Sequence, residues 1–127
     1  MNIYWNGIDI IDITRMRSLI TKNKKFKERI FTKKEIKSCE KIKNKFACYA
    51  KKFAAKEAFT KALGTGVSNG LSLNEIEINN NHKGKPFLEL KNKSYRIVKM
   101  TIKKNFKVYL SLSDEKNYAV ASVIIVK

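Results

Sequence analysis

Acidic residues and histidine are scarce in this chain of 127 residues. Eleven Asp and Glu stand against 28 Lys and Arg, which gives a formal net charge of +17, and His82 is the single histidine. A balance this basic predicts an anionic partner, such as a nucleic acid, a membrane surface, a phosphorylated ligand or an acidic protein. Part of the excess follows from a composition rich in Lys, Asn and Ile, so charge alone does not choose the partner.

Several motifs of catalysis and ligand binding are missing. His82 lies in the polar stretch NNNHKGK and is expected in a solvated loop, so no Ser-His-Asp or Cys-His arrangement supports nucleophilic catalysis. Walker-A and GxGxxG patterns are absent, and GTGVSNG is too loose to count as either. Cys39 and Cys48 have no CxxC and no histidine near them, and their spacing suits neither a zinc site nor a disulfide framework. We expect two reduced thiols.

Long apolar runs are absent as well. The N-terminus has no apolar segment of signal-peptide length, because Asn6, Asp9 and Asp12 interrupt it. The longest apolar stretch, YAVASVIIV at 118–126, is about half a membrane span. We therefore expect a cytoplasmic protein with no membrane partner. The length predicts a single domain, 1–127, at the small end where oligomerisation often adds stability.

Periodicity predicts an α+β fold. Strands are expected at 3–13, 71–79, 86–90, 107–113 and 118–126, and a turn at 114–117 joins the last two. The dipeptide Asn6-Gly7 is typical of a hairpin, although a bulge or kink in a continuing strand fits equally well.

The expected helices are one long helix and several shorter ones. The clearest is 45–63, which ends at Gly64. The basic segment 15–45 looks helical, and Thr32 followed by Glu35 is a capping-box pattern that begins a new helix there. Residues 93–104 are weakly helical, with Tyr95, Val98 and Ile102 on one face.

Glu57 and Lys61 lie one turn apart on the long helix. The simplest interpretation is a solvated ion pair. Three features favour a site instead: the Phe and Ala neighbours, the GTG that lets a backbone approach a phosphate, and Asp9 in the apolar stretch GIDIIDI. Asp9 could equally face solvent. If Asp9 and Glu57 converge, however, they form a hard-oxygen Mg²⁺ site, and Lys61 adds a cation suited to phosphoryl-type transfer.

The basic segment 15–45 has three interpretations. It could be a solvated face, a nucleic-acid surface or a dock for an acidic protein. Phe26, Phe31 and Phe46 are too widely spaced for the aromatic interleaving of nucleic-acid binders, and no DNA- or RNA-binding fingerprint is present. Nucleic acid is therefore the less favoured partner.

Several stretches together resemble one family, the holo-[acyl-carrier-protein] synthases, which are the small bacterial type of 4'-phosphopantetheinyl transferase. They are GIDIIDITRM (7–16), FKERIFTKKE (26–35), FACYAKKFAAKEAFTKALGTGVSNG (46–70), LNEIEINNNHKGKPFLEL (73–90) and VYLSLSDEKNYAVASVIIV (108–126). The resemblance implies an antiparallel sheet packed with one long helix and shorter helices. It also implies transfer of the 4'-phosphopantetheine arm of coenzyme A to a serine of apo acyl carrier protein, with release of 3',5'-ADP, in fatty acid biosynthesis.

The resemblance also implies a site. Asp9 and Glu57 match the acids that hold Mg²⁺ on the coenzyme A pyrophosphate, and Lys61 matches a lysine at the phosphates or the leaving group; these three are the catalytic candidates. The positions expected around coenzyme A are Lys52, Lys61, Gly64, Thr65, Gly66, Pro86 and Ser113. The proton acceptor is either a metal-associated water or Glu57.

The resemblance also implies a homotrimer with each active site at a subunit interface, and a first basic helix that binds the acidic carrier. Arg15 matches an arginine of that helix. Arg17, Lys22, Lys25 and Arg29 are its candidate neighbours.

The chain departs from the family pattern twice. It reads YWNGID where GIGxD is usual, and SLSD where SLSH is usual, so Asp114 replaces a histidine. Asp114 could hold a metal-bound water or cap the turn. The competing functions are a basic nucleic-acid-binding module and a catalytically degenerate family member.

Overall fold

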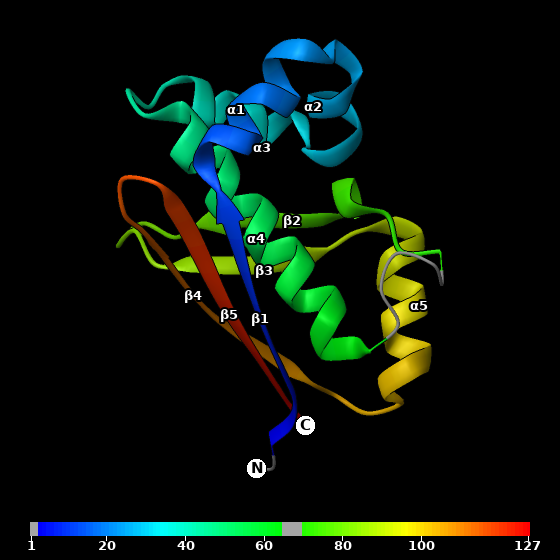
Figure 1. Cartoon of the computed structure of the whole chain (residues 1–127). Helices are drawn as coiled ribbons and strands as arrows, with labels where there is room; N and C mark the ends of the chain where they lie inside the picture. Colours follow the sequence, from blue (N-terminus) through cyan, green and yellow to red (C-terminus); the bar gives the residue numbers. More distant parts are fainter. Residues whose placement is uncertain (1–2, 65–69) are drawn as a thin grey trace.

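The computed structural model describes residues 3–64 and 70–127 and has the expected α+β architecture (Figure 1). The strands are β1 (Ile3–Asp12), β2 (Ile76–Asn80), β3 (Pro86–Leu90), β4 (Lys107–Asp114) and β5 (Tyr118–Val126). The helices are α1 (Ile13–Lys22), α2 (Lys24–Ile30), α3 (Lys33–Glu40), α4 (Lys45–Leu63), the 3-10 turn η2 (Leu73–Glu75) and α5 (Asn92–Ile102).

The strands form two antiparallel sheets. The larger has the order β1-β5-β4, and its β1–β5 pairing runs from Ile3 opposite Val126 to Asp12 opposite Tyr118. The smaller sheet is the hairpin β2–β3. Helix α4 packs on one face of the larger sheet, chiefly against β1 and β5, while α1–α3 gather at one end of the molecule (Figure 1).

Small residues let α4 lie close to the sheet. Asn44 caps the first turn by accepting a hydrogen bond from the backbone N–H of Ala47, and Gly64 ends the helix with a φ of 74°. A Cβ added at Gly7 of β1 would lie 2.1 Å from the carbonyl oxygen of Ala58. Strand β1 and helix α4 are therefore in backbone contact, which a larger residue at position 7 would prevent.

Capping side chains divide the basic segment into three helices. The carboxylate of Asp12 accepts a hydrogen bond from the backbone of Arg15 and caps α1, and Asn23 caps α2. Thr32 and Glu35 form the expected capping box of α3, which confirms that prediction.

The structure decides one open alternative and corrects two details of the predicted elements. Of the two possibilities at Asn6-Gly7, the continuing strand is observed, and the irregularity in its register falls between Ile3 and Trp5. The predicted strand 71–79 contains η2, and strand begins only at Ile76, because the buried Leu71 and Leu73 have the alternating spacing of a strand. On α5, Val98 and Ile102 are buried, but Tyr95 is 47% exposed.

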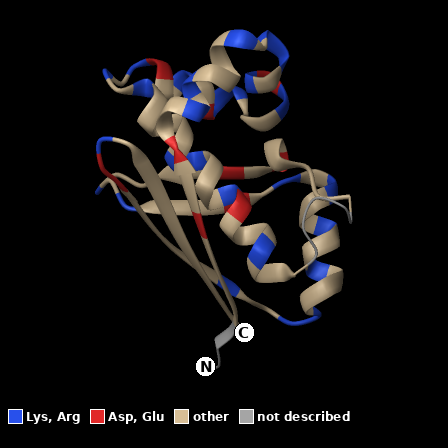
Figure 2. Cartoon of the chain, viewed as in Figure 1, with Lys and Arg blue, Asp and Glu red and all other residues tan. Residues whose placement is uncertain are grey.

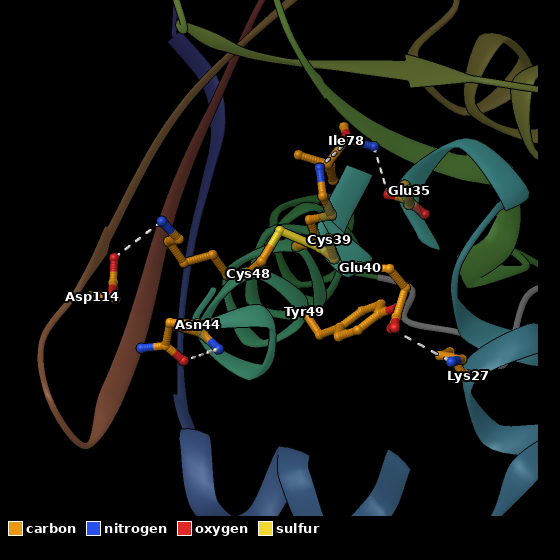
Figure 3. The surroundings of a disulfide bond; sticks show 12 residues. Lys27, Glu35, Cys39, Glu40, Asn44, Cys48, Tyr49, Ile78 and Asp114 are labelled. Atoms are coloured by element: carbon orange, nitrogen blue, oxygen red, sulfur yellow. Dashed lines mark hydrogen bonds and ion pairs between the residues drawn. A yellow bond between two sulfur atoms is a disulfide. The ribbon is translucent and has the colours of Figure 1, made fainter. Parts of the chain in front are cut away.

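The prediction of two free thiols is also wrong. Cys39 and Cys48 form a disulfide, with Cα atoms 5.5 Å apart (Figure 3). Cys39 lies in the last turn of α3 and Cys48 in the first turn of α4, and the short connection folds these two helix ends together.

A buried ion pair also joins α3 and α4, deeper in the core than the disulfide. The ammonium of Lys56 donates to the carboxylate of Glu35 at 2.8 Å, and neither side chain is exposed. Lys56 also donates to the carbonyls of Leu73 and Ile76, which ties α4 to η2 and β2. Among the described residues, no helix is both long and apolar enough to span a bilayer.

Candidate active site

Asp9 faces α4 from the edge strand of the larger sheet. One carboxylate oxygen, Oδ1, accepts a hydrogen bond from the ammonium of Lys61 at 3.0 Å, and Lys61 also donates to the carbonyl of Ile8 at 3.2 Å. The second oxygen, Oδ2, is buried and has no hydrogen-bond partner among the described residues. A buried carboxylate oxygen without a partner indicates a place for a cation.

Glu57 lies beside this pair on α4. Burial raises the pKa of the Glu57 carboxyl, the nearby charge of Asp9 raises it further, and Lys61 opposes both effects. The ion pair that Lys61 forms is with Asp9, so the interpretation of Glu57 and Lys61 as a simple surface pair is not what the structure shows. The three catalytic candidates therefore meet where β1 contacts α4.

The donor set suits a hard divalent cation. Asp9 and Glu57 are close enough for their charges to interact, and the described residues contain no cluster of three or more His, Cys, Asp or Glu side chains. Mg²⁺ is typically held by one or two carboxylates together with water and substrate phosphates. The residues present therefore fit Mg²⁺ bound jointly with a phosphate ligand. Gly64 ends the same helix, whereas the expected Thr65 and Gly66 lie outside the described residues.

Lys52 and Pro86 lie in a different place. They line a cavity of about 440 Å³ between the start of α4, the β2–β3 turn and β4. Its lining also contains Ser38, Ile42, Cys48, Lys51, Asn80, Gly84 and Leu112. The buried ammonium of Lys52 donates to the carbonyl of Ile78, and burial lowers the pKa of Lys52. We refer to this space as the lysine cavity.

The lysine cavity and the Asp9 site lie on opposite sides of α4. Five residues separate Lys52 from Glu57, which places them about 140° apart around a helix of 3.6 residues per turn. Lys52 is directed to β2, whereas Lys61 is directed to β1. The cavity also borders β4, and β1 and β4 are the two edges of the larger sheet. One chain thus holds the two groups of expected site residues apart.

Ser113 and Asp114 occupy the end of β4. Ser113 is exposed and lines a separate cavity of about 230 Å³ with Ile10 and Tyr118. The carboxylate of Asp114 forms an ion pair with Lys51 at 3.1 Å (Figure 3). Asp114 therefore has a role that neither sequence hypothesis included, since it holds a lysine at the wall of the lysine cavity.

The partner-binding candidates share one surface. Lys and Arg gather over α1–α3 (Figure 2), and the exposed residues include Arg15, Arg17, Lys22, Lys25 and Arg29 of α1 and α2. The guanidinium of Arg17 lies 5.1 Å from the ring centroid of Phe46, which restrains its orientation. This surface fits an acidic partner.

Sequence reasoning missed Lys51 and the Glu35–Lys56 pair. A signal for the latter was available, because Lys52 and Lys56 share a face of α4 that is otherwise rich in alanine. Two lysines one turn apart on a buried face require partners from other elements.

Comparison with known proteins gives a consistent answer. Residues 6–123 match the family model described as the 4'-phosphopantetheinyl transferase superfamily. A holo-[acyl-carrier-protein] synthase of Clostridium tetani is 45% identical over 119 residues, which are 94% of this chain and 92% of that protein.

Solved structures agree with this match. The crystal structure of holo-[acyl-carrier-protein] synthase from Neisseria meningitidis has a TM-score of 0.87 and 33% identity, and covers 99% of this chain and 100% of that one. A holo-(acyl-carrier-protein) synthase from Bacillus anthracis, in complex with CoA (3',5'-ADP), has a TM-score of 0.79 and 35% identity, and covers 97% of this chain and 96% of that one. The chain therefore belongs to the 4'-phosphopantetheinyl transferase superfamily and, within it, to the holo-[acyl-carrier-protein] synthases.

Proposed function

We propose that this protein transfers the 4'-phosphopantetheine arm of coenzyme A to a serine of apo acyl carrier protein and releases 3',5'-ADP. The observation that carries the proposal is the buried Oδ2 of Asp9 beside Glu57, which has no partner in the part of the chain that the structure describes, while the ammonium of Lys61 binds the other oxygen of Asp9. These groups suit a pyrophosphate and its metal ion. We place the reaction in the cytoplasm, where it prepares the carrier for fatty acid biosynthesis.

The protein has to stabilise negative charge on the phosphates in the transition state, and no covalent intermediate with the protein is needed. The serine oxygen attacks the β-phosphorus of coenzyme A, and the bond from that phosphorus to the oxygen of 3',5'-ADP breaks. Bound at Asp9 and Glu57, Mg²⁺ supplies Lewis-acid stabilisation of the pyrophosphate oxygens. Lys61 offsets negative charge on the leaving group from the adjacent turn of α4.

Glu57 is the side chain to which we assign the serine proton. Its carboxylate is partly buried beside Asp9 and Lys61, which places it among the groups that face the pyrophosphate. Asp9 has two other roles. Its Oδ1 accepts the hydrogen bond from Lys61 and orients that lysine, and its Oδ2 is the oxygen that we assign to the metal.

We further propose a homotrimer in which each active site lies between two copies. Coenzyme A carries its nucleotide and its pyrophosphate in one molecule, yet the lysine cavity and the Asp9 site are on opposite sides of α4 in a single chain. The face of the larger sheet turned away from α4 exposes apolar side chains, with Ile8 64% and Ile10 60% exposed. A second copy packed on this face would bury them and join the two halves.

The acidic carrier is assigned to the exposed basic surface of α1 and α2. Arg15 lies in the first turn of α1, which follows β1 and so connects this surface with the strand that carries Asp9. Complementary charge there raises the rate of encounter and makes carrier binding sensitive to salt.

The decisive assay incubates the protein with Mg²⁺, coenzyme A and apo carrier and follows the carrier's intact mass for addition of the arm. Glu57→Gln is expected to lower the rate by at least about a hundredfold, while Glu89→Gln, at an exposed residue of β3, serves as the matched control. Full activity of Glu57→Gln would remove Glu57 from the site. Coenzyme A binding by the unaltered protein without transfer would identify a degenerate family member.

Mixed oligomers test the interfacial site. Glu57→Gln and Lys52→Met are each expected to be inactive, because each spoils one half of every site. Refolding the two variants together produces interfaces with an intact Glu57 from one copy and an intact Lys52 from the other, so activity is expected to return. Mixed trimers seen by native mass spectrometry without recovered activity would contradict the arrangement.

A further inference from the structure

The Cys39–Cys48 disulfide forms part of the wall of the lysine cavity. Cys48 is one of the lining residues, together with Lys51 and Lys52 of the same helix. Ser38 and Ile42, which flank Cys39 on α3 and in the following turn, form the facing part of the wall. The disulfide therefore fastens one side of the cavity to the other.

Other contacts hold the same junction when the disulfide is absent. The hydroxyl of Tyr49 donates to the carboxylate of Glu40 at 2.6 Å (Figure 3). Lys45 donates to the same carboxylate at 3.2 Å. Deeper in the core, Lys56 binds Glu35. Opening the disulfide is therefore a local change at the cavity wall and leaves α3 docked on α4.

The two sulfurs differ in their surroundings. Cys39 is 0% exposed, whereas Cys48 is 8% exposed and borders the cavity. Lys51 and Lys52 line the cavity, and Asp114 offsets the charge of Lys51, so a positive charge remains that favours small anionic thiols. We therefore expect an incoming thiolate to meet Cys48 rather than Cys39.

We propose that Cys39–Cys48 is a reversible thiol–disulfide exchange site, entered through Cys48, whose redox state sets the affinity of the lysine cavity for its anionic ligand. A small anionic thiolate attacks Sγ of Cys48, the Cys39–Cys48 bond breaks, and Sγ of Cys39 leaves with the electron pair and takes a proton. A second thiolate then attacks the small-molecule sulfur of the mixed disulfide. Two small thiols are oxidised to their disulfide, and the two cysteines are reduced to thiols.

The reduced cavity is expected to bind more weakly because its wall must be ordered on binding. With the disulfide closed, Ser38 and Ile42 are fixed relative to Lys51 and Lys52. With it open, this part of the wall is held by the Glu40 contacts and, deeper in the core, by the Glu35–Lys56 pair. Ordering a few side chains corresponds to a loss of about tenfold in affinity. The identity of the ligand as the nucleotide end of coenzyme A rests on the proposed function.

Reactivity tests the exchange site without any assay of activity. With oxidised glutathione as the probe, Cys39→Ala leaves Cys48 free and is expected to gain one glutathione, read by intact mass. The matched variant Cys48→Ala leaves Cys39 free and is expected to stay unmodified until it unfolds. Equal labelling of both folded variants, checked by a cooperative thermal melt, would overturn entry through Cys48.

Calorimetric titration of 3',5'-ADP tests the coupling. The disulfide form is expected to bind about tenfold more tightly than the same protein reduced by a phosphine, and Cys39→Ala/Cys48→Ala is expected to bind like the reduced form in either condition. The reduced protein is expected to keep a cooperative melt, with Tm lower by about 10 °C. Equal affinities in the two redox states refute the coupling. If neither form binds 3',5'-ADP, the nucleotide assignment and the coupling fail together, while the labelling contrast still decides the exchange site.

Discussion

The buried Glu35–Lys56 pair makes a sharp prediction about stability. Lys56→Met keeps the length and apolar stem of the side chain but removes an ammonium that donates to Glu35 and to the carbonyls of Leu73 and Ile76. The carboxylate of Glu35 keeps the backbone N–H groups of Thr32 and Ile78 as donors but loses its counter-charge. Leaving one member of a buried pair uncompensated costs about 3–5 kcal/mol.

That loss is large against the whole stability of such a domain. Native domains are stable by about 5–15 kcal/mol, so Lys56→Met is expected to remove about a third or more of the free energy of unfolding. Urea denaturation followed by circular dichroism measures it. Glu35→Gln/Lys56→Met is expected to lose less than the sum of the two single changes, because no charge is left buried in the double variant.

The pH dependence provides a separate check. Burial lowers the pKa of Lys56 below 10.5, and the neighbouring Glu35 only partly offsets this. The folded protein then binds fewer protons than the unfolded chain between the lowered pKa and 10.5, so this group makes stability rise with pH in that window. The rise should be missing from Lys56→Met. A loss below about 1 kcal/mol in Lys56→Met, the range of exposed pairs, would refute the reasoning.

Three other predictions concern the surface and the α3–α4 junction. Arg15→Glu is expected to raise KM for the carrier by about tenfold or more while KM for coenzyme A is unchanged; an equal loss for both substrates would indicate misfolding instead. Asp114→Asn breaks the partly exposed ion pair with Lys51, so stability should change by less than about 1 kcal/mol. The same change should tighten 3',5'-ADP binding at low salt, and unchanged calorimetric affinity would count against a role of Lys51 in the cavity. The hydrogen bond from Tyr49 is the largest cause of the lowered pKa of Glu40, so the stability it gives is present above pH 4.5 and lost as the pH falls through the lowered value. Tyr49→Phe should therefore lose less Tm than the unaltered protein as the pH is lowered from neutral, measured by thermal melts. An unchanged dependence of Tm on pH would mean that other carboxylates cause the loss.

Local chemistry allowed much of the fold to be predicted. The capping box of Thr32 and Glu35, the stop at Gly64 and the alternation of the last two strands each depend on residues close in sequence. The same reasoning failed at 71–79, where the two buried leucines at alternate positions are Leu71, which precedes the 3-10 turn, and Leu73, which begins it. Their spacing is also that of the buried side of a strand.

The site was harder because its partners come from distant elements. Nothing in the spacing of Glu57 and Lys61 shows that Lys61 turns to Asp9, which depends on the contact of Gly7 with α4. The disulfide was missed for a similar reason, because only the folded junction of α3 and α4 brings Cys39 and Cys48 together. Helical periodicity describes which side a residue faces and contains no information about what lies opposite.

The contact of Gly7 with α4 has a consequence for how this protein can change. Backbone touches backbone there, so the spacing between the acid of β1 and the charged residues of α4 is set by main-chain atoms that side-chain substitution barely adjusts. The residues of β1 and α4 around this contact can therefore change little in sequence without altering the spacing of the site. Adaptation to a new carrier has to take place on the exposed helices α1 and α2, whose surface residues can change without moving the main chain at this contact.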